Sequence, residues 1–152
     1  ASARRLSLGM TMIEILVVLS IMALGAAIVV PMVAGSGVST GDLKAAARQL
    51  AAGLRLARSE AITQRHETVL TLDLEKRSFR VAKQAREIEL PSKVELKLFT
   101  AQSDLVDERQ GSIRFFPDGG SNGGRITVAS GERKYEVDVD WLTGRVAILD
   151  GS

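Results

Sequence analysis

The chain of 152 residues has no cysteine and a single histidine, His66. Without cysteine, neither a disulfide framework nor a thiolate metal site can form. One histidine excludes a multi-histidine metal site and leaves one residue around which a histidine-activated serine could be built. The sequence therefore predicts no metal, no cofactor and no enzyme activity.

An excess of charge of one sign is also absent from most of the chain. The formal net charge is +2, and Arg4 and Arg5 account for both units, so the charges after Gly9 sum to zero. A general nucleic-acid binder carries a basic excess on its folded part. We therefore expect no nucleic-acid partner.

The longest apolar run extends from Met10 to Val30, and Glu14 is the only charged residue in these 21 positions. At about 1.5 Å per residue, such a helix covers a hydrocarbon core of about 30 Å. The basic residues before it predict that this end stays in the cytoplasm and that the rest is exported. A secretory signal peptide would have a shorter core of about 7–15 apolar residues. Hydropathy alone favours an uncleaved single-span anchor.

Glu14 is a costly residue in such a run. An acid at the centre of a bilayer costs about 2.5–3.5 kcal/mol, and acids in membrane helices are usually paired. The alternative is an acid tolerated near the interface, where the positive end of the helix dipole favours an anion. We favour a partner for Glu14.

The rest of the chain reads as one domain in which a helix precedes an antiparallel sheet. Pro31 and the Gly- and Ser-rich residues 32–41 predict a kink or linker, and Ser39 or Thr40 can cap the next helix. Residues 42–66 form the expected amphipathic helix. Its apolar residues recur at spacings of three and four, at Leu43, Ala47, Leu50, Leu54, Ala57 and Ala61.

Beyond Glu67 the apolar period changes to two, which predicts strands and turns over residues 68–150. The expected strands are residues 68–74, 79–82, 94–99, 112–116, 125–130, 133–141 and 146–150. In the longest of them, Tyr135, Val137, Val139 and Trp141 should face the core. The apolar stripe of helix 42–66 is the available cover for this sheet, so the predicted fold class is α+β.

Two polar segments could be taken for ligand sites, and a structural interpretation is favoured for both. The loop "DGGSNGG", residues 118–124, lacks the Lys and the helix start of a phosphate-binding loop, because Arg125 opens a strand. Glu136, Asp138 and Asp140 alternate along a strand, which favours a solvated face over a calcium site. His66 is expected to be an ordinary surface residue.

The residues around Gly9 resemble the processing signal of type IV pilins and of the pseudopilins of type II secretion. Between Arg4 and about Pro31 they share a basic leader, Gly, a hydrophobic residue, Thr, two apolar residues, Glu and an apolar helix. The resemblance implies that residues 1–9 are a leader peptide and that a prepilin peptidase cuts between Gly9 and Met10. It also implies N-methylation of Met10, although the family usually begins the mature chain with Phe.

The same resemblance implies a pilin-like fold, in which a long N-terminal helix combines a transmembrane segment, residues 10–31, with the amphipathic segment that packs on the sheet. It also offers a partner for Glu14, which lies four residues, about 6 Å along a helix, from the new N-terminus. In a staggered filament of parallel helices, Glu14 can meet the Met10 ammonium of a neighbouring subunit.

A second resemblance lies in "RFFPDGGSNGGRITV", Arg114 to Val128, and "LTGRV", Leu142 to Val146. These segments are similar to the H-type minor pseudopilins of type II secretion and, more loosely, to the FimT and FimU minor pilins. The resemblance implies a minor subunit near the tip of a pseudopilus, with residues 42–152 in the periplasm and an anchor in the bacterial inner membrane. The implied partners are other minor pseudopilins, the major pseudopilin, the prepilin peptidase and secreted cargo.

Charged residues on helix 42–66 suggest where neighbours bind. Lys44, Arg48, Arg55 and Arg58 lie on one flank at 100° per residue, with Arg65 at the margin, and Asp42, Glu60 and Glu67 lie on the other. We expect the basic flank to contact partner subunits. The alternative is a FimT- or FimU-like minor pilin of a type IV pilus that binds DNA along this flank. An exported enzyme is a third hypothesis, but no set of nucleophile, base and orienting residue is visible.

Overall fold

The computed structural model describes Gly9 and residues 11–34, 38–82, 84, 86–91, 93–100, 105–107 and 109–151. The side chains of residues 26–34 and 105–107 are outside this set. The chain divides into two compact units, residues 1–37 and 38–152, and each is described by itself. Met10 and residues 1–8 lie outside the described residues.

The first unit contains one helix, α1 (Met12–Ala34). Its first turn is capped by Thr11, whose Oγ1 accepts a hydrogen bond from the Glu14 amide at 3.3 Å and whose carbonyl oxygen accepts one from the Ile15 amide at 3.2 Å. The helix continues through Pro31, where the sequence predicted its end. A proline removes one backbone hydrogen bond, and here it does not stop the helix. Among the residues described, no helix has both the length and the apolarity that crossing a membrane requires.

The second unit begins with helix α2 (Thr40–Gln64), predicted at residues 42–66. Ser39 is the N-cap, so one of the two expected caps is used. Its hydroxyl accepts from the Asp42 amide at 3.1 Å, and the Asp42 carboxylate accepts from the Ser39 amide at 3.3 Å, which completes a capping box. The helix ends where Arg65 adopts a left-handed conformation with φ 54°.

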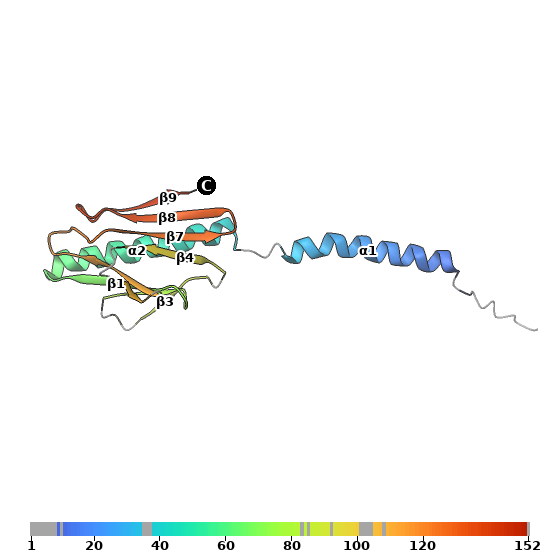
Figure 1. The fold of residues 1–152 in the computed structure, drawn as a ribbon, viewed down its shortest axis with the longest axis horizontal. Helices are drawn as coiled ribbons and strands as arrows, with labels where there is room; N and C mark the ends of the chain where they lie inside the picture. Colours follow the sequence, from blue (N-terminus) through green and yellow to red (C-terminus); the bar gives the residue numbers. More distant parts are fainter. Residues whose placement is uncertain are drawn as a thin grey trace, which may run out of the picture. The chain divides into compact units, whose positions relative to one another are not determined.

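The strands form two antiparallel sheets where the sequence predicted one (Figure 1). The first sheet has the order β3-β2-β1-β6-β5, from β1 (Thr68–Asp73), β2 (Ser78–Val81), β3 (Ile88–Glu89), β5 (Leu105–Asp107) and β6 (Gln110–Phe115). The second has the order β4-β7-β8-β9, from β4 (Glu95–Phe99), β7 (Gly124–Ser130), β8 (Arg133–Val139) and β9 (Val146–Asp150). The α+β class is confirmed, and β3 and β5 are strands that periodicity did not predict.

Helix α2 packs on both sheets and contacts β1, β2 and β6 of the first and β7, β8 and β9 of the second (Figure 1). The predicted apolar stripe is fully buried, which confirms that α2 is the cover. At Gly53 the helix lies close to the first sheet. A Cβ at Gly53 would lie 2.5 Å from Cε2 of Phe79, so the absence of a side chain lets the ring pack directly on the helix.

One prediction about the core is wrong. Val137 and Val139 are buried as expected, but Trp141 is 68% exposed and Tyr135 is half-buried. Strand β8 ends at Val139, because the carboxylate of Asp140 accepts hydrogen bonds from the Leu142 and Thr143 amides and turns the chain. The period-two pattern therefore stops before Trp141, and the indole is left at the surface.

Candidate functional site

The basic flank of α2 is the site that the sequence proposed for partner contacts. At 100° per residue, Lys44, Arg48, Arg55 and Arg58 fall within about 80° of one another around the helix axis. The side chains of Lys44, Arg48 and Arg55 are exposed, and that of Arg58 is half-buried. The structure therefore places three of the four candidates where a neighbouring molecule can reach them.

Arg58 also makes hydrogen-bond contacts within the folded unit. Its Nε donates a hydrogen bond to the Gly119 carbonyl oxygen at 3.0 Å and lies 3.2 Å from the Thr143 carbonyl oxygen. Gly119 belongs to the loop between β6 and β7, and Thr143 to the turn between β8 and β9. One arginine of α2 thus holds two loops that are distant in the sequence. Arg55 makes a longer contact, from Nη2 to the Val146 carbonyl oxygen at 3.4 Å.

The two loops meet so closely that glycine is needed at both. Gly144 has φ 65°, and a Cβ there would overlap the Gly119 carbonyl oxygen and crowd the Arg58 guanidinium. Gly119 has φ 89°, and a Cβ there would lie 3.1 Å from Nη2 of Arg58. The expectation of a turn-rich loop over residues 118–124 is confirmed, with Gly119 and Gly123 at positive φ.

Asp140 fixes the β8–β9 turn. Its Oδ1 accepts hydrogen bonds from the Thr143 amide at 2.8 Å, the Thr143 hydroxyl at 3.0 Å and the Leu142 amide at 3.0 Å. These bonds, the one from the Thr143 amide first, lower the pKa of Asp140 below its ordinary value of 3.8. The carboxylate is therefore charged at neutral pH, and its hydrogen bonds stabilise the turn.

The two acids of β8, Glu136 and Asp138, form ion pairs on the outer face of the sheet. Arg125 of β7 lies 3.1 Å from Asp138 and 3.5 Å from Glu136, and Lys134 lies 3.6 Å from Glu136. Within the residues that the structure describes, no group of three or more His, Asp or Glu is placed to hold a metal ion.

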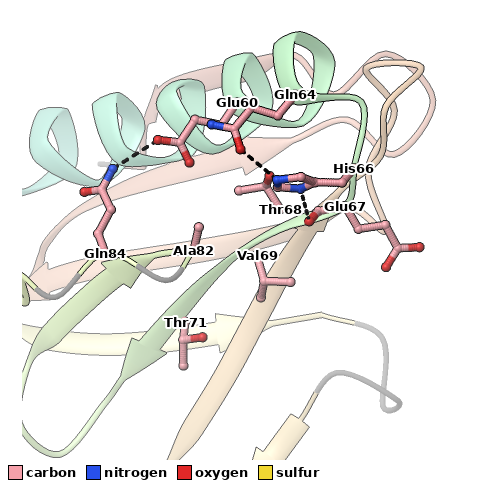
Figure 2. Close-up of a pocket in the computed structure, with 9 residues that line it drawn as sticks. All are labelled: Glu60, Gln64, His66, Glu67, Thr68, Val69, Thr71, Ala82 and Gln84. Atoms are coloured by element: carbon pink, nitrogen blue, oxygen red, sulfur yellow. Dashed lines mark hydrogen bonds between the residues drawn. The ribbon is translucent and has the colours of Figure 1, made fainter.

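The acidic flank of α2 borders a groove of about 650 Å³ beside β1 (Figure 2). Glu60 accepts a hydrogen bond from Nε2 of Gln84 at 3.0 Å. The ring nitrogens of His66 lie 2.7 Å from Oε1 of Gln64 and 2.9 Å from the Glu67 carbonyl oxygen. Both nitrogens of the single histidine are thus occupied at the surface, as Figure 2 shows.

The N-terminal candidates are described only in part. Gly9 is exposed, Met10 lies outside the described residues, and Glu14 is exposed in the first turn of α1. The cap at Thr11 was not predicted from the sequence, although Thr11 and Glu14 have the Thr-x-x-Glu spacing of a capping box. The Glu14 position therefore has a local role in starting the helix as well as its proposed role between subunits.

Solved structures of similar shape define the class of protein. The minor pseudopilin EpsH from the type 2 secretion system of Vibrio cholerae matches with a TM-score of 0.58 and 13% identity, covering 73% of this chain and 99% of that one. The type IV minor pilin FimU of Pseudomonas aeruginosa matches with a TM-score of 0.56 and 18% identity, covering 72% of this chain and 89% of that one. The fold is therefore pilin-like, as expected, and the transmembrane part of the expected N-terminal helix stays a prediction.

Sequence comparison then identifies the family. The family described as Type II transport protein GspH matches residues 46–144. A protein of Xanthomonas campestris pv. campestris named Type II secretion system protein H is 32% identical over 143 residues, 94% of this chain and 83% of that protein. The chain belongs to the GspH family of type II transport proteins. The minor pseudopilin function expected from the sequence is thereby confirmed.

Proposed function

We propose that the chain is a subunit near the tip of the pseudopilus, anchored in the inner membrane by one span with its folded domain in the periplasm. In this position it contacts other minor pseudopilins, the major pseudopilin and secreted cargo, and it supports protein export across the outer membrane without chemistry of its own. The observation that carries the proposal is the family match over residues 46–144, which covers most of the second folded unit.

The anchor and its processing rest on the sequence of the first 31 residues. Residues 1–9 act as a leader that the prepilin peptidase removes between Gly9 and Met10, and the new amine of Met10 is methylated. Residues 10–31 then span the bilayer, with Arg4 and Arg5 on the cytoplasmic side before cleavage. Mass spectrometry of membrane-extracted protein should show a chain that begins at methylated Met10. An intact leader in cells with active peptidase would contradict this step, and Gly9→Val should block it.

Assembly in the membrane depends on Glu14. Without a counter-ion this carboxylate is costly in hydrocarbon, and the Met10 ammonium of a neighbouring subunit is the proposed partner. The exposed position of Glu14 on α1 supports an intermolecular contact, because its backbone amide bonds to Thr11 while the carboxylate stays accessible.

Assembly outside the membrane depends on the basic flank of α2. Lys44, Arg48 and Arg55 are exposed, and their charges are available to acidic residues of neighbouring pseudopilins. Charge pairs at the rim of an interface mainly affect association rates and partner choice, whereas exposed pairs contribute about 0–1 kcal/mol to folding stability.

The test compares charge reversals in a strain that lacks the chromosomal gene. Arg48→Glu combined with Arg55→Glu should weaken cross-linking to partner pseudopilins and lower secretion, while the free energy of unfolding stays nearly unchanged. Arg86→Glu combined with Lys97→Glu makes the same change of charge at exposed residues outside α2 and should have no such effect. Normal secretion in the deletion strain itself would contradict the proposed function.

A further inference from the structure

A second groove, of about 640 Å³, lies between α2 and the β8–β9 turn. Three arginines line it, Arg55 and Arg58 from the helix and Arg145 from the turn. The remaining lining residues are Asp140, Thr143, Gly144 and Val146. Arg145 was not among the candidates from the sequence, because nothing in the "LTGR" turn indicates that it meets a helix far earlier in the chain.

The charges in this arginine groove do not cancel. Asp140 is its one carboxylate, and its Oδ1 already accepts three hydrogen bonds within the turn. None of the three arginines forms an ion pair with a residue in the part of the chain that the structure describes. Four arginines outside the groove, Arg80, Arg109, Arg114 and Arg125, each pair with a carboxylate. The groove therefore keeps a net positive charge of two.

One of the three guanidinium groups, that of Arg58, is oriented by contacts within the folded unit. Arg58 is oriented by its Nε contacts with the Gly119 and Thr143 carbonyl oxygens, and its Nη atoms make no hydrogen bond to any described residue. The side chain of Arg145 is exposed and likewise donates no hydrogen bond within the described residues. A planar guanidinium donates two parallel N–H···O bonds to a carboxylate, and fixing it beforehand lowers the entropy lost on binding.

We propose that the arginine groove binds carboxylate side chains of an acidic segment on a neighbouring protein subunit. This inference rests on the proposed function, which supplies the neighbour, and it adds the chemistry of the contact and the residue Arg145. The occupant is an acidic peptide segment because the groove is positive, has room for a few side chains and lies on a domain whose total charge is near zero.

Nucleic acid is the competing polyanion and is less favoured. Duplex DNA could follow Arg48 and Lys44 along α2, but attraction to DNA grows with the number of phosphates neutralised over an extended basic surface. The groove itself offers three arginines beside one carboxylate, which is a smaller basic surface than a duplex contact needs.

The test measures binding of a defined acidic peptide to the full chain in phosphatidylcholine nanodiscs, which carry no net lipid charge. Fluorescein-labelled hexaglutamate is titrated at low salt and followed by anisotropy. Arg145→Gln and Arg55→Gln should each weaken binding about tenfold, because each removes a charge-assisted hydrogen-bond donor. Arg86→Gln, the same change at an exposed arginine that lies outside α2 and does not line the groove, should alter the affinity less than about twofold. Arg58 is left intact in these variants because it also holds the loops.

Two readouts decide the outcome. The proposal predicts that Arg145→Gln also weakens cross-linking to partner pseudopilins in membranes, with an unchanged thermal unfolding midpoint. It is overturned if hexaglutamate does not bind, if Arg86→Gln weakens binding as much as Arg145→Gln, or if cross-linking is unaffected. Tighter, Arg145-dependent binding of a 20-base-pair duplex, about the length of two helical turns, would assign the groove to nucleic acid instead. None of these results depends on the secretion test of the proposed function. Failure of the groove proposal can therefore be distinguished from failure of the proposed function.

Discussion

Arg58 donates a hydrogen bond from Nε to the carbonyl oxygen of Gly119, 61 residues further along the chain, at 3.0 Å. The same nitrogen lies 3.2 Å from the Thr143 carbonyl oxygen. One side chain of α2 therefore holds the loop that follows β6 and the turn that follows β8. These two loops belong to the two segments in which the sequence resembles the H-type pseudopilins. Arg58 therefore contacts both of the segments that carry this resemblance.

Replacing Arg58 should destabilise the domain. Arg58→Ala removes a charged donor from two backbone carbonyls, and we expect a loss of about 1–2 kcal/mol, below the full value of about 1.5–3 because the side chain is only half-buried. Urea unfolding measures the change. Arg48→Ala on the exposed part of the same helix should stay within about 0.5 kcal/mol. Equal losses for the two variants would show that the Arg58 contacts add nothing.

Alanine substitutions at Gly144 and Gly131 can be compared to measure how much steric crowding lowers the free energy of unfolding. Both have positive φ, 65° and 62°, but a Cβ at Gly131 meets nothing within 4 Å, whereas one at Gly144 overlaps the Gly119 carbonyl oxygen. Gly131→Ala should cost about 1–2 kcal/mol for the left-handed backbone alone. Gly144→Ala should cost clearly more, by at least about 1 kcal/mol, because backbone must move. Similar unfolding free energies for the two variants would contradict the close approach of the loops.

Most of the fold could be predicted from local patterns in the sequence. The three-and-four spacing of apolar residues located α2, and the period of two located β1, β2, β4, β6, β7, β8 and β9. The strands β3 and β5 span two and three residues, which is too short for a period to show. The division into two sheets depends on which strands pair, and pairing between distant strands leaves no local pattern.

Contacts between distant residues explain what the sequence did not show at the site. The exposure of Lys44, Arg48 and Arg55 followed from helical periodicity. The two roles of Arg58 and the place of Arg145 beside it did not, because both depend on turns that Asp140 and the loop glycines create. Trp141 was misplaced for the same reason, since the hydrogen bonds of one carboxylate ended the strand early.

Gly53 tests how closely α2 approaches the first sheet. An alanine Cβ at this position would lie 2.5 Å from Cε2 of Phe79 and 3.2 Å from Cδ1 of Leu70, both of which are buried. We expect Gly53→Ala to lower the unfolding free energy by about 1–3 kcal/mol despite its better helix propensity. Gly41→Ala, in the first turn and 3.6 Å from the Ser39 hydroxyl, should be neutral or stabilising by up to about 1 kcal/mol. Stabilisation by both variants would disprove the tight packing.

Acid stability should depend on Asp73. Hydrogen bonds lower the pKa of this carboxyl below 3.8, first the one from the Lys76 amide at 2.8 Å, with the Gln110 side chain and the Glu75 amide adding to it and burial opposing it. Because the folded-state pKa is below the unfolded one, this stabilisation is present above about pH 4 and is lost as the pH falls through the folded-state pKa. Asp73→Asn should flatten the decline in unfolding free energy below pH 4, measured by urea unfolding. An unchanged acid slope would rule out Asp73 as its source.

Glu14 lies in the first turn of α1 and is proposed to contact a neighbouring subunit. Two substitutions of Glu14 test this contact. Glu14→Leu removes the charge and makes the segment more apolar, so insertion should be equal or better. Cleavage should persist, because it depends mainly on Gly9 and the leader. Association with neighbours in the membrane should fail, since the Met10 ammonium loses its counter-ion. Glu14→Gln keeps a polar side chain that a capping box accepts, so partial association would mean that a hydrogen bond suffices.

The control for helix capping is Thr11→Ala, which removes the hydroxyl that accepts from the Glu14 amide and leaves the carboxylate intact. Loss of a cap typically costs about 1 kcal/mol of helix stability. If Glu14 acts through the Met10 ammonium, Thr11→Ala should support cross-linking and secretion nearly as well as the parent, whereas Glu14→Leu should support neither. Equal defects in the two variants would assign the role of Glu14 to the start of the helix. A Glu14→Leu protein that is cleaved, cross-links and secretes normally would show that the acid is merely tolerated.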